Sequence, residues 1–135
     1  MSNTHAADEA AIQAVLTDSY KAWDAGDADG MVADYTEDAT AILPGSLRDG
    51  REAIRKSMTA AFAGPLQGST TSNRQLSIRF IGADGAIVIS EAAILFPGET
   101  EVPESRKVNA TWVFEKRDGR WMVAAYHNSP VVAGA

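Results

Sequence analysis

Four segments rich in β-branched and aromatic residues fill the second half of this 135-residue chain. Runs of this composition, bounded by Gly, Pro and Asp, are typical of strands. Asp84-Gly85 and Asp118-Gly119 mark tight hairpins, while Pro97–Glu104 is a longer acidic loop. The segments therefore predict one antiparallel meander. They are Gln75–Ile81, Ala86–Phe96, Arg106–Lys116 and Arg120–Ser129.

The first half of the chain has helical spacing instead. Apolar residues such as Ile12, Leu16 and Trp23 recur at intervals of three and four, the mark of an amphipathic helix. We read Gly45–Arg51 as a plain strand-to-helix connection. The predicted elements are a helix over Ala6–Ala25, a shorter helix capped by Asp27 and running through Met31, Val32 and Tyr35, a strand over Ala39–Leu43 and a helix over Gly50–Phe62.

Both faces of the predicted sheet are apolar. Ala86–Ile89 and Trp112–Phe114 carry apolar side chains at consecutive positions, which predicts burial on both sides. Helices of the same chain cover only one face of a sheet. We therefore expect a homodimer through the outer sheet face.

Composition narrows the classes of function. The chain has no cysteine, and its two histidines, His5 and His127, are far apart, so we expect no metal site and no cofactor. With 18 acidic and 12 basic residues the net charge is −6, and the basic residues form no stripe, which disfavours nucleic acid. The apolar stretches are too short to cross a bilayer, and residues 1–9 do not resemble a secretory signal. We expect a cytoplasmic protein that does not enter membranes.

Four short sequence motifs occur in order along nearly the whole chain. They are Trp23-Asp24-Ala25-Gly26-Asp27, Tyr35-Thr36-Glu37-Asp38-Ala39, Gly50-Arg51-Glu52-Ala53-Ile54 and Asp118-Gly119-Arg120-Trp121-Met122-Val123, the last leading to His127-Asn128-Ser129. In order and spacing they resemble the nuclear transport factor two-like superfamily, and the closing Ala-Ala-Tyr-His-Asn-Ser is similar to its SnoaL-like polyketide cyclase and SgcJ/EcaC groups. The resemblance implies an α+β, cone-shaped, cystatin-like fold, in which N-terminal helices pack on a strongly curved antiparallel sheet, as a single domain over residues 1–135.

The same resemblance argues against one known activity of the superfamily. Its steroid isomerases place a carboxylate base before the proline that ends the first strand and a phenol on the first helix. The matching positions here hold Leu43 and Ser19. Neither side chain can perform those roles, so we reject that isomerase mechanism.

His127 is the candidate acid or base, because it is a side chain with an ordinary pKa near neutrality on an apolar strand. Its neighbour depends on the turn at Asp118-Gly119. A two-residue turn places Ala110 opposite His127, whereas a three-residue turn places Asn109 there. We favour the second, which puts Asn109, Thr111, Val113, Val123, Ala125 and His127 on the cavity face and Trp112, Phe114, Met122 and Tyr126 on the dimer face.

Three functions are compatible with these residues. The preferred one is a pocket that binds a small apolar or polyketide-like molecule in bacterial polyketide or enediyne biosynthesis. The others are an isomerase, cyclase or hydratase that uses His127, and an oligomerisation domain without a ligand. The predicted ligand-binding residues are Tyr20, Trp23, Tyr35, Glu91, Asn109, Thr111, Val123 and Asn128.

Overall fold

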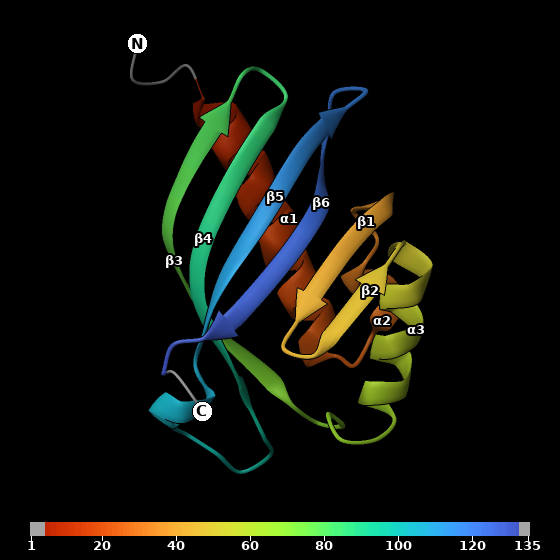
Figure 1. Cartoon of the computed structure of the whole chain (residues 1–135), viewed down its shortest axis with the longest axis vertical. Helices are drawn as coiled ribbons and strands as arrows, with labels where there is room; N and C mark the ends of the chain where they lie inside the picture. Colours follow the sequence, from red (N-terminus) through yellow and green to blue (C-terminus); the bar gives the residue numbers. More distant parts are fainter. Residues whose placement is uncertain (1–4, 133–135) are drawn as a thin grey trace.

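A computed structural model describes residues 5–132 (Figure 1). Three α-helices precede most of the sheet: α1 (Ala6–Asp24), α2 (Ala28–Met31) and α3 (Arg51–Phe62). A short 3-10 helix, η1 (Glu104–Arg106), lies between the fourth and fifth strands. The strands are β1 (Tyr35–Leu43), β2 (Ser46–Asp49), β3 (Thr70–Ile81), β4 (Gly85–Leu95), β5 (Val108–Arg117) and β6 (Arg120–Pro130).

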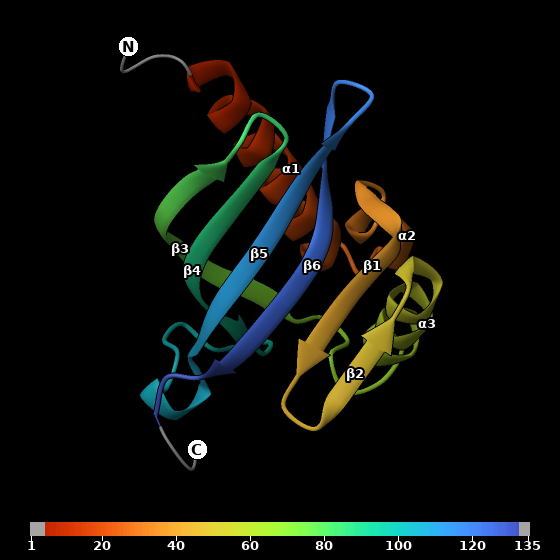
Figure 2. The same ribbon diagram turned by 45° about the horizontal axis from the view of Figure 1, so that its top comes forward.

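The six strands form one curved, mixed sheet in the order β2-β1-β6-β5-β4-β3. Strands β3 to β6 make the predicted antiparallel meander. Strand β1 then joins β6 in parallel and pairs with β2 as a hairpin. Figures 1 and 2 show α1 passing behind the sheet and α3 beside β1 and β2. The fold is therefore α+β, as predicted, with one parallel pair inside the sheet.

The helices form where their apolar spacing predicts them. Ile12 and Leu16 are buried on the inner side of α1, and Ile54 and Met58 on that of α3. The carboxylate of Asp27 accepts a hydrogen bond from the amide of Gly30 at 2.9 Å, the predicted cap of α2.

The prediction for residues 31–51 was wrong in two places. Tyr35 does not end α2 but begins β1. After β1 the chain turns at Pro44-Gly45, where Gly45 has a φ of 75°, and Leu43 pairs with Ser46. The expected plain connection is thus a hairpin. Its second strand, β2, carries Arg48 on the edge of the sheet.

The turn at Asp118-Gly119 is a two-residue turn. Both residues have positive φ, 52° and 77°, and Arg117 pairs with Arg120. The favoured three-residue turn was therefore wrong.

A β-bulge then shifts the register of β6 by one residue. Phe114 pairs with Val123, whereas the preceding residue Val113 pairs with Ala125, so Ala124 is an extra residue on β6. As a result His127 lies opposite Thr111, and not opposite Asn109 or Ala110. The bulge also changes which face the later residues of β6 occupy.

The prediction was right to group Trp112, Phe114 and Tyr126 on one face of the sheet, but wrong to make that face the outer one. Trp112 and Phe114 are buried against the helices, and Tyr126 packs beside them, while His127 is exposed. The aromatic residues therefore belong to the interior and cannot form a dimer contact. Val123 is also interior, as part of the core cluster.

Aromatic rings hold the sheet to the helices on this inner face. The ring of Trp112 lies 4.5 Å from that of Tyr126 and 6.0 Å from that of Tyr20, measured between centroids. Trp23 packs edge-on against Phe62. None of the described helices has the length and apolar character needed to cross a membrane.

Candidate functional site

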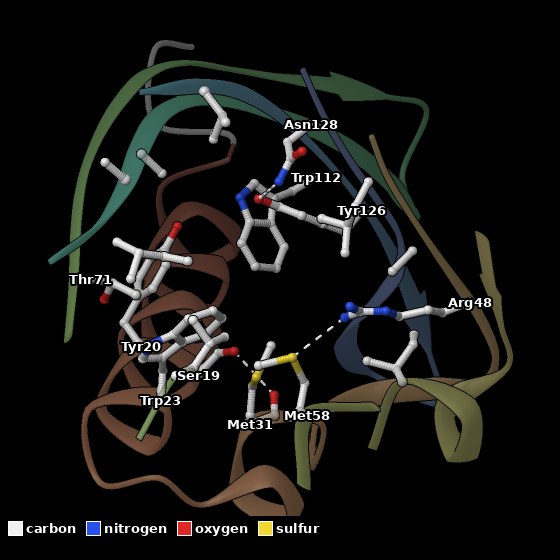
Figure 3. A pocket seen from close by; sticks show the side chains of 18 of the residues that line it. Ser19, Tyr20, Trp23, Met31, Arg48, Met58, Thr71, Trp112, Tyr126 and Asn128 are labelled. Carbon is white, nitrogen blue, oxygen red and sulfur yellow. Dashed lines mark hydrogen bonds between the residues drawn. The ribbon is translucent and has the colours of Figure 1, made fainter. Parts of the chain in front are cut away.

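A cavity of about 300 Å³ lies between the inner face of the sheet and the helices (Figure 3). It occupies the end of the sheet near the connection between β4 and β5. Its walls are mainly apolar and aromatic. The lining residues are Ser19, Tyr20, Trp23, Met31, Tyr35, Ala41, Leu43, Arg48, Ile54, Met58, Leu66, Thr71, Ala92, Ala93, Ile94, Arg106, Val108, Trp112, Tyr126 and Asn128.

The first half of helix α1 packs in the hydrophobic core, and its last turns line the cavity. Ile12 and Leu16 pack in the core, whereas Ser19, Tyr20 and Trp23 line the cavity. The Ser19 hydroxyl donates to the carbonyl of Met31 at 3.1 Å, which ties α1 to α2. The indole of Trp23 donates to Ser69 Oγ at 3.1 Å, which fixes the orientation of that ring. This part of the cavity wall is held in place by hydrogen bonds before any ligand arrives.

A cluster of polar groups enters the cavity from β5 and β6. Asn128 Nδ2 donates to the Tyr126 hydroxyl at 3.0 Å. Asn128 Oδ1 and Trp112 Nε1 are buried, and neither has a hydrogen-bond partner among the described residues. Figure 3 shows these three side chains together on one side of the cavity. Buried polar groups without partners carry a free-energy cost, so the cluster is suited to bind polar atoms of a ligand.

The three tyrosines near the cavity all resist ionisation. Burial raises the pKa of Tyr20 to about 12, with a smaller contribution from Tyr126. Burial also raises the pKa of Tyr35 and that of Tyr126. At neutral pH each phenol therefore keeps its proton and acts as a hydrogen-bond donor rather than a base.

Two arginines line the cavity, and their partners differ. Arg106 makes a bidentate ion pair with Glu99, at 2.6 and 3.0 Å, and also donates to the carbonyl of Ile94. Arg48 has no such partner: its Nη1 donates to Met58 Sδ at 3.4 Å, and its buried Nε contacts no acceptor among the described residues. Burial lowers the pKa of Arg48. Arg48 remains charged at neutral pH, because guanidinium does not deprotonate in proteins.

Four of the residues predicted to bind a ligand line this cavity. Tyr20 and Trp23 reach it from α1, Tyr35 from the start of β1 and Asn128 from β6. Asn128 reaches the inner face because of the bulge at Ala124, which the prediction did not include.

The remaining predicted residues lie elsewhere. His127, the candidate acid or base, is exposed on the outer face, and Asn109 is exposed at the start of β5. Thr111 lies on the outer face opposite His127. Glu91 is near the cations of Arg74 and Lys107, at 3.7 and 4.0 Å.

Val123 faces inward but does not line the cavity. His127, Thr111 and Asn109 thus share the outer face of the sheet and do not line the cavity.

Sequence reasoning missed Arg48, Trp112 and Tyr126. The two aromatic residues were assigned to the dimer face because small and partly polar side chains were expected to line the cavity. Arg48 was passed over inside a segment interpreted as a connection. Its position between a Pro-Gly turn and a helix was the available signal.

Ser19 and Leu43 both line the cavity. These are the positions that the steroid isomerases would fill with a phenol and a carboxylate. An alkyl chain and a hydroxyl already bonded to Met31 cannot replace those groups. Among residues 5–132, no three histidine or carboxylate side chains lie close enough together to hold a metal ion.

Comparison with known families decides the classification. Residues 12–133 match the family model described as a SnoaL-like domain. The chain belongs to the SnoaL-like domain family. A search of the curated proteins finds no match.

Solved structures related to this SnoaL-like domain have the same architecture. A cystatin-like domain of unknown function from Nostoc punctiforme superposes with a TM-score of 0.87 at 27% identity, covering 95% of this chain and 80% of that chain. A nuclear transport factor two-like protein of unknown function from Shewanella oneidensis gives 0.77 at 20% identity, over 90% and 98% of the two chains. A ketosteroid isomerase-like protein from Erwinia carotovora gives 0.72 at 19% identity, over 91% and 95%. These similarities confirm the predicted cystatin-like fold.

Proposed function

We propose that this SnoaL-like domain binds a small, largely apolar molecule in the cavity between its sheet and its helices. The observation that supports this most directly is the combination of apolar walls with buried polar groups that lack partners, at Trp112, Asn128 and Arg48. Ligand pockets typically have this composition, and about 300 Å³ is the lower end of their usual volumes. An oligomerisation domain without a ligand would have little reason to keep such groups unpaired.

The family suggests a metabolic setting for this binding. The SnoaL-like resemblance, together with the ending Ala-Ala-Tyr-His-Asn-Ser that is similar to the SgcJ/EcaC group, favours a polyketide-like or enediyne-related ligand in bacterial secondary metabolism. A fused-ring polyketide fits the cavity's chemistry, since it offers an extended apolar surface with a few hydroxyl and carbonyl groups.

The lining favours binding over proton-transfer catalysis. Among the described residues, no carboxylate and no imidazole lines the cavity. The three tyrosines keep their protons at neutral pH because burial raises their pKa values. His127, the residue on which an isomerase, cyclase or hydratase was based, is exposed on the far side of the sheet. The cavity can orient a molecule and donate hydrogen bonds to it, but it offers no general base.

A titration with a neutral fused-ring probe tests the proposal. Trp23 and Trp112 line the cavity, so 2-methylanthraquinone bound there would quench tryptophan fluorescence. Ala93→Phe is the matched variant, because Ala93 is buried, with 7% exposure, and lines the cavity without belonging to the core cluster. We expect micromolar binding by the wild type and loss of binding in Ala93→Phe.

Ala83→Phe is the control, since it adds the same side chain in an exposed turn. It should bind as the wild type does. Equal binding by Ala93→Phe, at unchanged melting temperature, would place the probe outside the cavity and contradict the proposal.

A homodimer through the outer sheet face belongs to the same proposal. No described helix covers that face (Figure 1), and it presents Ile87, Ile89 and Val113 as partly exposed side chains. The contact would thus be aliphatic, because the aromatic residues face inward. Light scattering at micromolar concentration should give twice the monomer mass, and Val113→Lys should reduce it to the monomer. A monomeric wild type would exclude the dimer.

A further inference from the structure

The guanidinium of Arg48 is the one cationic group in the cavity that has no carboxylate partner among residues 5–132. It projects from the edge strand β2 across the cavity wall toward Met58 (Figure 3). A thioether sulfur is a weak acceptor, and the Nε atom beside it has no acceptor at all. A partly buried charge loses part of its hydration, and without an acidic partner Arg48 gains no ion pair in return, so it contributes little to the stability of the fold.

Most of the other arginines in the described part of the chain differ from Arg48, because they have acidic partners. Six of them contact acidic side chains: Arg51, Arg55, Arg74, Arg106, Arg117 and Arg120. Arg79, like Arg48, has no ion pair, but it is exposed on β3, where water solvates it. Among the arginines of residues 5–132, only Arg48 is partly buried and makes no ion pair with a carboxylate.

Arg106 provides a comparison inside the same cavity. Glu99 occupies both of its terminal nitrogens, and the ring of Phe96 lies 4.9 Å from its guanidinium carbon. A second anion would therefore compete with Glu99 at Arg106, but would meet no competitor at Arg48. An anionic ligand group has one favourable place in this cavity.

The polar cluster of β5 and β6 gives the ligand a second contact. Trp112 Nε1, which lies near the Tyr20 hydroxyl, makes no close hydrogen bond, and Asn128 Oδ1 has no donor among the described residues. Both lie on a side of the cavity that differs from that of Arg48 (Figure 3). The rest of the cavity lining is mainly apolar and aromatic, and includes Met31 and Tyr20. A matching molecule has an acidic group, an apolar body and a hydroxyl or carbonyl group.

We infer that the cavity takes an apolar carboxylic acid, whose carboxylate pairs with Arg48 and whose hydroxyl or carbonyl group contacts Trp112 and Asn128. The inference rests on the proposed ligand-binding function and narrows its ligand class. Guanidinium and carboxylate match in geometry and charge, and a bidentate pair of this kind is strong when water is excluded.

Two probes of the same shape test this inference. Anthraquinone-2-carboxylate carries the acid, and 2-methylanthraquinone is its neutral counterpart. We expect the wild type to bind the acid roughly tenfold more tightly, as for one charge-assisted contact. Arg48→Met, which keeps an unbranched apolar side chain, should lose this preference while it still binds the neutral probe. Arg79→Met, which removes an exposed arginine, should leave the preference unchanged.

The outcomes separate the two proposals. Equal affinity of the wild type for both probes, or an undiminished preference for the acid in Arg48→Met, would overturn the inference and leave the proposed function intact. Failure of the wild type to bind either probe would contradict both.

A second measurement covers the case in which Arg48→Met folds poorly. Without ligand, we expect the melting temperature of Arg48→Met to equal or exceed that of the wild type, since an unpaired charge is removed. Arg48→Lys keeps the charge without the planar fork, and it should retain part of the preference. A large loss of stability in Arg48→Met would mean that Arg48 serves the fold rather than a ligand, and would overturn the inference.

Discussion

Asn128 Nδ2 donates a hydrogen bond to the hydroxyl of Tyr126 at 3.0 Å, and both side chains enter the cavity from β6. The two residues are two positions apart on the strand, so they face the same side of the sheet, which here is the inner side. Since the amide oxygen of Asn128, Oδ1, lacks a partner among the described residues, the cluster is incomplete without a ligand. Its cost to stability can be measured.

Tyr126→Phe should lower the free energy of unfolding by about 1 kcal/mol, because it leaves the Asn128 amide without any partner. The double variant Tyr126→Phe/Asn128→Leu removes both polar groups and should regain that loss. Urea unfolding measures both variants. A double variant less stable than Tyr126→Phe would show that the pair supports the fold rather than a ligand.

The tyrosines should titrate abnormally. The chain has three, Tyr20, Tyr35 and Tyr126, and burial raises the pKa of each, to about 12 for Tyr20. The neutral phenols are favoured in the folded state, so their contribution to stability is complete below the unfolded pKa of about 10 and is lost as pH rises beyond it.

Absorbance at 295 nm tests this expectation. At pH 10 the native protein should show less phenolate than the protein in urea, which should be about half ionised there. A native titration with a normal midpoint would place the rings in water and contradict the buried arrangement.

The ion pair of Glu99 with Arg106 should hold the connection between β4 and β5 beside the cavity. Arg106, and then the amide of Phe96, hold the pKa of Glu99 below its usual range. A lowered carboxylate pKa contributes stability above the ordinary value of about 4.3, and that contribution is lost as pH falls through the folded pKa.

Glu99→Gln should therefore melt at a lower temperature than the wild type at pH 7, and the difference should shrink below pH 4. Glu101→Gln, at an exposed position in the same connection, is the control and should change little. A constant difference across this pH range would exclude the ion pair as its cause.

His127 is exposed on the outer face, which argues against its predicted role as an acid or base in the cavity. His127→Ala should leave the affinity for a cavity ligand unchanged, because the imidazole is exposed on the far face. Asn128→Ala, one residue later, should weaken it, since Asn128 lines the cavity. The same titration measures both variants. Weaker binding only in His127→Ala would require a different register for β6.

Sequence patterns predicted the parts of the fold with strong local signals. Helices α1 and α3 have continuous apolar spacing, and the Asp27 cap is a local interaction. The four strands of the meander also have long β-branched runs. The short strand β2, in contrast, has four residues and no alternation that separates it from a loop. Its pairing with β1 depends on a tertiary contact that spacing does not reveal.

The candidate site was predicted only in part, for a related reason. Tyr20 and Trp23 line the cavity because α1 lies where periodicity placed it, whereas Tyr35 reaches the cavity from β1 and not from the predicted helix. One extra residue, Ala124, exchanges the faces of Tyr126 and His127. Bulge positions follow from packing of the whole sheet, and Ala carries no signal for one. The same extra residue turns Asn128 inward, whereas Thr111 faces outward through the regular alternation of β5.

The central claim is that the cavity holds a small molecule. Native mass spectrometry of the protein purified from its own cells tests it most directly, with Ala93→Phe purified in parallel. The account predicts an added mass on the wild type that is released on denaturation and is absent from Ala93→Phe. An identical bound mass on both proteins, or no bound molecule together with no binding of either anthraquinone probe, would contradict it.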